Sequence, residues 1–239
     1  ASKALVSINS SNEVIKYIGE SIYGTLDNCM LFTTMHDPAN QSIHICHSFG
    51  LEDAYHIAKA LTGLDAQAHV VYLTDYTPDK IAIYQSKELY HLGNNPLYEL
   101  CAHTISKPIC SGIEDALGIK DVYVIAFVWE EQLFGGIVII NNGKCSLRQQ
   151  KLVENLVNLA SVALQRLSAE EQLLKEHANL DAILASSPVG MLVINEDQFI
   201  TLANPAASRM FDIKPAVIRN LKCGEFLGCI NSQKPGEGC

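Results

Sequence analysis

The sequence predicts a mixed α/β (α+β) fold in which helices flank an antiparallel sheet. Two pairs of strand-like runs, within 29–49 and 122–141, are each joined by a short connection and predict hairpins. A stretch without Pro or Gly, from Ser146 to Ser187, predicts one long helix. With 239 residues, of which 48% are apolar, the chain is long enough for one or two domains with a sizeable core.

The elements before the long helix follow from local patterns. Ser11 can cap a first helix whose apolar residues form one stripe, and Gly63 can end a second helix. Asp-Pro-Ala-Asn at 37–40 is a turn sequence, and an acidic connection joins the second hairpin. In chain order we expect a helix at 12–27, strands at 29–34 and 42–49, a helix at 51–64, a strand at 69–74, a helix at 97–106, and strands at 122–129 and 133–141.

A second, smaller unit follows the long helix. Strand-like runs at 190–195 and 199–203 enclose a Glu-Asp-Gln turn and predict a third hairpin. Asn204 is a good helix cap, and Pro205 suits the first helical position. The long helix carries many charges at 168–175, so we expect that part to be a connector rather than a buried core helix.

Composition argues against several classes of function. Seventeen Lys and Arg face 26 Asp and Glu, and a net charge of −9 disfavours a nucleic-acid partner. The apolar runs at 122–129 and 133–140 are too short for a bilayer, so we expect no membrane span in this chain. No signal-peptide pattern opens the sequence, and the first five cysteines are scattered without a CxxC pair. This cysteine usage indicates reduced, buried thiols and a cytoplasmic location.

Residues 1–167 resemble a GAF domain. The resemblance rests on the order of elements, on Leu-Phe-Gly-Gly-Ile-Val-Ile at 133–139 in the second hairpin, and on the closing helix at 156–167. It implies a GAF-like antiparallel sheet with a cavity for a small-molecule ligand. The Asn-Lys, Phe and Asp-Glu motif linked to cyclic nucleotides in that family is missing, as is the Asp-Ile-Pro signature of its bilin-binding members.

Residues 178–214 resemble the start of a PAS domain, through the sequences at 183–195 and 200–207. The later strands of a PAS domain are missing, so we expect a truncated domain and a chain that is a fragment of a longer signalling protein. The expected organisation is a GAF sensory domain at 1–167, a signalling connector helix at 168–180, and a partial PAS domain at 181–239.

GAF and PAS units joined by a helix are similar to the input regions of sensor histidine kinases. The resemblance implies a non-enzymatic sensory region of a two-component system, with an unknown small-molecule ligand and a downstream kinase or other output domain in cis. No phosphoacceptor-helix signature or Gly-rich nucleotide loop occurs, so no catalytic residue is expected. A methionine-sulfoxide reductase, which shares the GAF-like fold, would need reactive thiols in a pocket, and the cysteines show no such pattern.

Candidate ligand-binding residues come from the second strand and from the middle of the GAF-like region. On a strand, His44 and Cys46 share one face, from which they would line the cavity, with haem as one ligand to consider. The alternative is a strand packed on both faces, with ordinary hydrogen bonds to the histidines. The middle segment would form the lid of the cavity, and its candidates are Tyr72, Tyr84, His91, Tyr98, Cys101 and Cys110.

Three cysteines near the end of the chain, Cys223, Cys229 and Cys239, stand among glycines. They are candidate ligands of a metal or iron–sulfur site in the parent protein, whose cofactor is otherwise unknown. The alternative is that they are ordinary thiols in a loop, since a CxxC pair and a fourth ligand are missing. If these thiols, or His44 and Cys46, hold iron, the function would instead be a haem, iron–sulfur or thiol-based redox or metal sensor.

The long helix predicts a homodimer. Its apolar residues recur three and four positions apart, which is typical of a coiled-coil seam, and two small residues permit close approach. Two such helices in parallel would carry a shift in the GAF core to the next domain. The alternative is that this face only covers the sheet of a monomer. The expected dimer and relay residues are Val153, Leu156, Ala160, Ala163, Leu167 and Leu174.

Overall fold

The computed structural model describes residues 2–26, 28–63, 69–143, 149–212, 214–218 and 221–229. The chain forms two compact units, Ala1–Ala169 and Glu170–Cys239. Among the described residues, no helix combines the length and the apolar character that a membrane span requires.

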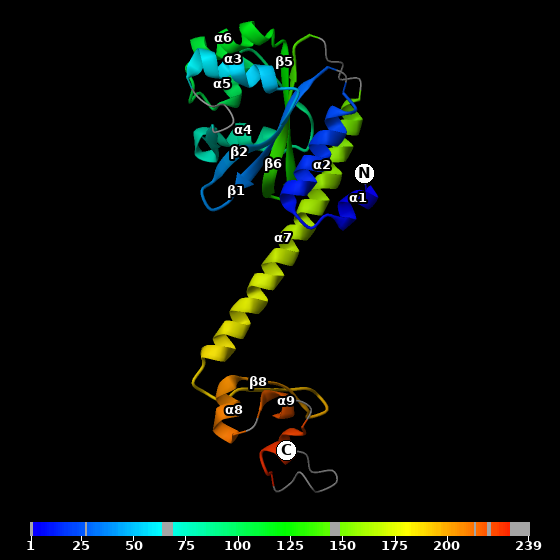
Figure 1. The fold of residues 1–239 in the computed structure, drawn as a ribbon, viewed down its shortest axis with the longest axis vertical. Coiled ribbons are helices and arrows are strands. Elements are labelled where there is room, and N and C mark those ends of the chain that lie inside the picture. Colours follow the sequence, from blue (N-terminus) through cyan, green and yellow to red (C-terminus); the bar gives the residue numbers. More distant parts are fainter. Residues whose placement is uncertain are drawn as a thin grey trace. The chain divides into compact units, whose positions relative to one another are not determined.

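The first unit is built on a six-stranded sheet in which every neighbouring pair is antiparallel, in the order β3-β2-β1-β6-β5-β4 (Figure 1). The pairing of β1 with β6 joins the two predicted hairpins into one sheet. Both hairpins and the α/β (α+β) class are therefore confirmed. The strands are β1 Met30–Asp37, β2 Ser42–Phe49, β3 Val70–Tyr72, β4 Tyr90–Leu92, β5 Asp121–Trp129 and β6 Gln132–Asn141.

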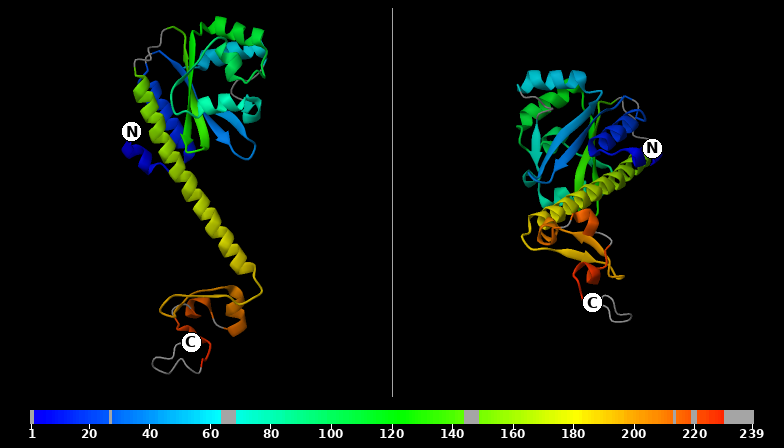
Figure 2. Two further views of the ribbon diagram at one scale, coloured as in Figure 1. Left: turned by 180° about the vertical axis from the view of Figure 1, so that it is seen from behind. Right: turned by 60° about the horizontal axis from the view of Figure 1, so that its bottom comes forward.

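Helices cover both faces of this sheet (Figures 1 and 2). On one face, α2 (Ser11–Tyr23) and α7 (Gln150–Ser186) pack on a core that includes Ile15, Ile139 and Val157. Over the other face lie α3 (Glu52–Thr62), α4 (Pro78–Tyr84), α5 (Pro96–Leu100) and α6 (Lys107–Leu117). The remaining elements of the unit are α1 (Ser2–Ser7) and the 3-10 helix η2 (Leu73–Asp75).

The predicted long helix is confirmed as α7, which is continuous across 168–176. Its expected cap, Ser146, lies outside the described residues. The helix expected at 97–106 is shorter than predicted, because the chain leaves α5 at Cys101 and both Ala102 and His103 take left-handed backbone angles, with φ of 48° and 64°. A new helix, α6, then begins at Lys107, with Pro108 in its first turn.

A Gly-Gly pair in β6 lets three strands approach closely. Gly135 has φ of 144°, and a Cβ atom there would lie 2.1 Å from the carbonyl oxygen of Thr34 in β1. At Gly136 a Cβ atom would lie 2.8 Å from the carbonyl oxygen of Ile125 in β5. Only glycine fits at these two positions, and both glycines also line the cavity described below.

The second unit contains the end of α7 and the predicted third hairpin, β7 (Leu192–Ile194) and β8 (Ile200–Ala203). Asn204 caps α8 (Pro205–Phe211) by accepting a hydrogen bond from the Ala207 N–H at 2.9 Å, as predicted. Its side-chain amide also donates to the carbonyls of Leu184 and Val189, which ties the end of α7 to the hairpin. Two short helices, α9 (Pro215–Ile218) and α10 (Cys223–Phe226), complete the unit.

Candidate functional site

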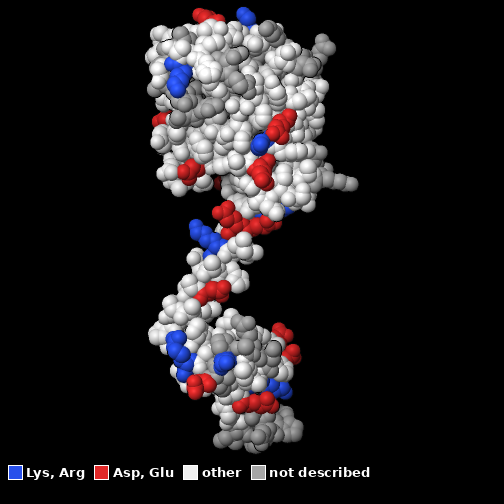
Figure 3. Space-filling view, viewed as in Figure 1, with Lys and Arg blue, Asp and Glu red and all other residues white. Residues whose placement is uncertain are grey.

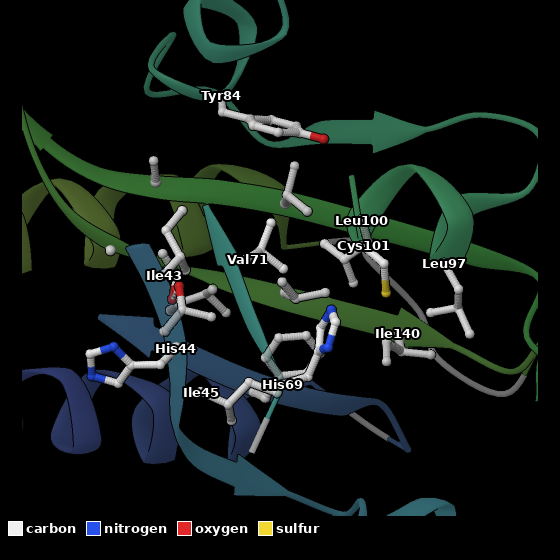
Figure 4. Close-up of a pocket in the computed structure, with 18 of the residues that line it drawn as sticks. Ile43, His44, Ile45, His69, Val71, Tyr84, Leu97, Leu100, Cys101 and Ile140 are labelled. Atoms are coloured by element: carbon white, nitrogen blue, oxygen red, sulfur yellow. Dashed lines mark hydrogen bonds between the residues drawn. The ribbon is translucent and has the colours of Figure 1, made fainter. Parts of the chain in front are cut away.

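A cavity of about 240 Å³ lies in the first unit, between the sheet and the helices α3 to α6 (Figure 4). The strands β1, β2, β3, β5 and β6 line one side of it, and α3 to α6 close the other. Its walls are mostly aliphatic, as shown by Ile43, Val71, Leu97, Leu100 and Ile140 in the figure. A concave, mostly apolar space is typical of small-ligand sites.

None of the described residues that line the cavity is Asp, Glu, Lys or Arg. Burial favours the neutral forms of several titratable groups on its walls. Burial lowers the pKa of His69, and it raises the pKa of Tyr76 and Tyr84 far above the usual range. The interior therefore disfavours charge. Outside, on the face of the first unit drawn in Figure 3, Lys and Arg side chains lie singly among Asp and Glu.

Two tyrosine hydroxyls of the cavity wall differ in their hydrogen bonding. The Tyr76 hydroxyl donates to the carbonyl oxygen of Leu100 at 2.5 Å. The Tyr84 hydroxyl is buried and has no hydrogen-bond partner among the described residues. The Tyr84 ring is held edge-on by Tyr76 and Tyr90, with ring centroids 5.5 and 6.3 Å away. A rigid aromatic side chain thus carries an unsatisfied hydroxyl at the wall of the cavity.

Two cysteines predicted as ligand contacts also line the cavity. Cys101 follows α5 and Cys110 lies in α6, and both are free thiols. Figure 4 shows the Cys101 sulfur among Leu97, Leu100 and Ile140. Burial, with a smaller contribution from the Cys110 thiol, raises the pKa of Cys101 to about 12. Burial likewise raises the pKa of Cys110. Both groups are therefore protonated and weakly nucleophilic near neutral pH.

Of the eight residues predicted for the ligand site, the cavity brings together His44, Tyr84, Cys101 and Cys110. Although His44 borders the cavity, Figure 4 shows its ring pointing away from the other labelled lining side chains, which include Ile43 and Ile45 of the same strand. Cys46 lies where the register of β2 against β1 shifts, and it does not line the cavity. The haem-ligand pairing of these two residues therefore has no common pocket here.

The other three predicted residues lie outside the cavity lining. Tyr72 is 48% exposed on β3. His91 contacts Asp121, with 3.1 Å between Nε2 and Oδ1, and Tyr98 stacks on His103 with ring centroids 4.3 Å apart. The aliphatic wall contributed by α3 and α6 was not foreseen from the sequence, because α6 was not predicted and aliphatic core residues carry no ligand signature.

The cysteines at the end of the chain do not form a described cluster. Cys223 is a free thiol, Cys229 is disulfide-bonded, and Cys239 lies outside the described residues. Within the described part of the chain, no three His, Cys, Asp or Glu side chains are placed to hold a metal ion. Cys29 is also disulfide-bonded, which corrects the expectation that the first five cysteines are all reduced.

The predicted dimer seam on α7 is largely used within the first unit. Val153, Leu156, Ala160 and Ala163 are buried in the core that α7 shares with α2 and the sheet. Leu167 packs against the edge of this core, and Leu174 is 72% exposed. The four buried side chains are therefore not free to contact a second copy. The spacing of these residues correctly indicated an apolar face of α7, and the structure shows that this face packs on the sheet.

Residues 178–238 match the PAS domain family, and no curated protein sequence matches the chain. The GAF domain/HD domain protein from Geobacter sulfurreducens is 13% identical, with a TM-score of 0.48 over 69% of this chain and 98% of that one. The GAF domain of a phosphoenolpyruvate-protein phosphotransferase from Acinetobacter is 13% identical, with a TM-score of 0.43 over 70% of this chain and 90% of that one.

The chromophore-binding domain of a bacteriophytochrome from R. palustris is 10% identical, with a TM-score of 0.50 over 71% of this chain. The match covers 59% of that longer chain. At such low identity the likeness concerns the fold alone. The element order and the sheet described above are those expected for a GAF domain. The chain therefore consists of a unit with a GAF-like fold, followed by a segment at 178–238 that matches the PAS domain family.

Proposed function

We propose that this chain is the sensory input region of a signal-transduction protein, binding a small molecule in the cavity and relaying that event through α7. GAF and PAS domains are sensory units of signalling proteins, which supports a sensory role. The observation that carries the proposal is that one sheet separates the cavity from α7. Val138 and Ile140 of β6 line the cavity, whereas Ile139 between them packs in the core with α7.

A short series of contacts links the cavity wall to α7. The Tyr84 ring contacts the Tyr90 ring at the start of β4. The preceding residue, Leu89, donates its backbone N–H to the carboxylate of Glu154 in α7 at 3.2 Å. Gln150 and Lys151 hold that carboxylate, which lowers the pKa of Glu154 and keeps it charged. Displacement of Tyr84 by a ligand would reach α7 by this route.

A second polar contact joins α7 to the sheet at β5. The register of β5 against β6 shifts between Phe127 and Val128. There, the Ser161 hydroxyl of α7 accepts a hydrogen bond from the Val128 N–H at 3.1 Å and donates to the Val157 carbonyl at 3.0 Å. Since both groups are buried, α7 follows the position of this strand bulge.

The proposed relay also needs two copies of α7, and the helix has an exposed apolar stripe for this contact. The stripe occupies positions a and d of a single heptad register. It is separate from the buried face that packs on the sheet. Its exposed members are Leu152, Leu159, Val162, Leu173, Leu180 and Ile183. We propose a parallel homodimer along this stripe, which would pass the signal to an output domain in cis, such as a histidine kinase in a two-component system.

Mass spectrometry of the purified chain under non-denaturing conditions tests ligand binding. We expect a small molecule that co-purifies with the chain or a neutral aromatic probe that binds with one-to-one stoichiometry. Ala54→Phe fills the cavity from α3 and should abolish this binding, whereas Ala182→Phe on the exposed face of α7 should not. Equal binding in both variants would show that the molecule sits elsewhere and would refute the cavity as the sensory site.

A further inference from the structure

We infer that the cavity takes a neutral, mostly hydrocarbon molecule whose single polar group accepts a hydrogen bond from the Tyr84 hydroxyl. This inference rests on the proposed function and names the class of ligand. It separates this site from one that holds a nucleotide, a phosphate or another anion.

The absence of charged groups among the described lining residues carries the first part of the inference. A ligand anion or cation in this space would lose its hydration and would meet no opposite charge from those residues. Burying an unpaired ion is strongly unfavourable, because its hydration is lost and no opposite charge replaces it. Burial also favours the neutral forms of Tyr76, Tyr84, Cys101 and His69 in the wall, which agrees with this inference.

The hydrogen bonds of the cavity wall support the second part of the inference, that the ligand accepts a hydrogen bond from Tyr84. Several polar groups of the lining already have partners: Tyr76 with Leu100, His69 with Thr104, Thr34 with Gly136, and Cys110 with Ile105. The buried Tyr84 hydroxyl has none among the described residues. Because burial raises its pKa, the group stays protonated and can donate. An acceptor on the ligand would remove the penalty of an unmade hydrogen bond.

The volume sets the size of the molecule. A cavity of about 240 Å³ holds about eight waters at roughly 30 Å³ each. A cresol or a short-chain alcohol is small enough for this space. Three probes with the same tolyl group therefore separate the possibilities: p-cresol has a hydroxyl, toluene has no polar group, and 4-methylbenzoate carries a negative charge at neutral pH.

Isothermal titration calorimetry of the full chain with these probes at pH 7.5 tests the inference. We expect p-cresol to bind most tightly, toluene less tightly, and 4-methylbenzoate at least tenfold more weakly than p-cresol. In Tyr84→Phe, p-cresol affinity should fall about two- to twelvefold, the equivalent of one hydrogen bond, while toluene affinity should stay the same. Tyr72→Phe, on an exposed ring outside the lining, is the matched control and should change neither.

The outcomes distinguish this inference from the proposed function. Binding of 4-methylbenzoate as tight as that of p-cresol would overturn the neutral-ligand inference and leave the sensory site in place. Equal losses for p-cresol and toluene in a folded Tyr84→Phe variant would overturn Tyr84 as the polar anchor. If none of the probes binds to the chain, both the inference and the proposed ligand site are refuted.

Discussion

The carboxylate of Glu154 in α7 accepts a hydrogen bond from the backbone N–H of Leu89, the residue before β4. Glu154 is 6% exposed, although it is a charged residue on a helix that otherwise buries only small and aliphatic groups toward the sheet. A buried carboxylate is retained where it satisfies groups that nothing else reaches. Here the Glu154 carboxylate joins the segment before β4 to α7.

Removing this carboxylate should therefore loosen the contact between β4 and α7. Glu154→Ala leaves the Leu89 N–H without its acceptor, and we expect a loss of about 1–3 kcal/mol in the free energy of unfolding. Urea denaturation measures the loss, and hydrogen exchange at the Leu89 amide should become faster. Glu171→Ala, at an exposed position of the same helix, is the control and should change neither value. An unchanged Leu89 exchange rate in Glu154→Ala would show that this bond does not hold the strand.

Replacing Gly135 in β6 or Gly112 in α6 by Ala should have opposite effects on stability. Gly135→Ala places a Cβ atom 2.1 Å from the Thr34 carbonyl oxygen at a backbone angle that favours glycine, so we expect a loss of several kilocalories per mole or failure to fold. Gly112→Ala, in α6 with open space around its Cβ, should stabilise the chain by about 0.5–1 kcal/mol. Thermal denaturation followed by circular dichroism compares the two variants, and a tolerated Gly135→Ala would contradict the close strand contact.

Stability should fall as the pH rises above about 9. The pKa of Cys101 is about 12 in the folded chain, against an ordinary value of 9.0, so the folded state keeps a proton that the unfolded state releases. The stabilising contribution is thus complete below pH 9 and is lost progressively toward pH 12, at up to about 1.4 kcal/mol per pH unit for one such group. Urea denaturation at pH 7, 8, 9 and 10 should show this decline, and Cys101→Ala should reduce its slope. A flat profile would contradict the burial of this thiol.

The dimer prediction distinguishes two faces of α7. Leu180→Glu lies on the exposed stripe and should convert a dimer to a folded monomer in size-exclusion chromatography with light scattering. Leu156→Glu lies in the core and should instead destabilise the first unit itself. Lys175→Glu, off the stripe, is the control for the charge change. A monomeric wild-type chain at tens of micromolar would refute the paired-helix relay.

Sequence patterns predicted the framework of this chain well. Alternation and turn residues located both hairpins of the first unit, and the absence of Pro and Gly located α7, because these signals are local. The cap at Asn204 and the start at Pro205 were also correct. Helix α6 was missed, since the positive backbone angles at Ala102 and His103 that divide it from α5 are not signalled by glycine.

The site was less predictable, because it depends on which face of each strand turns inward. His44 and Cys46 were chosen for their chemistry, yet the pairing of β2 with β1 and β3 presents Ile43 and Ile45 to the cavity. One residue of register exchanges the two sets. Similarly, the spacing on α7 could not tell a face that covers the sheet from one that meets a second helix. Tyr84 was identified, but its missing hydrogen-bond partner is visible only in three dimensions.

Hydrogen–deuterium exchange of α7 with and without p-cresol tests the central claim most directly, because it observes the relay itself. We predict that ligand in the cavity changes exchange at the Leu89 amide and along 150–164, and that Glu154→Ala removes the change in α7 while p-cresol still binds. Protection confined to the cavity wall, with exchange in α7 unaffected by a bound ligand, would contradict transmission from the cavity to the helix.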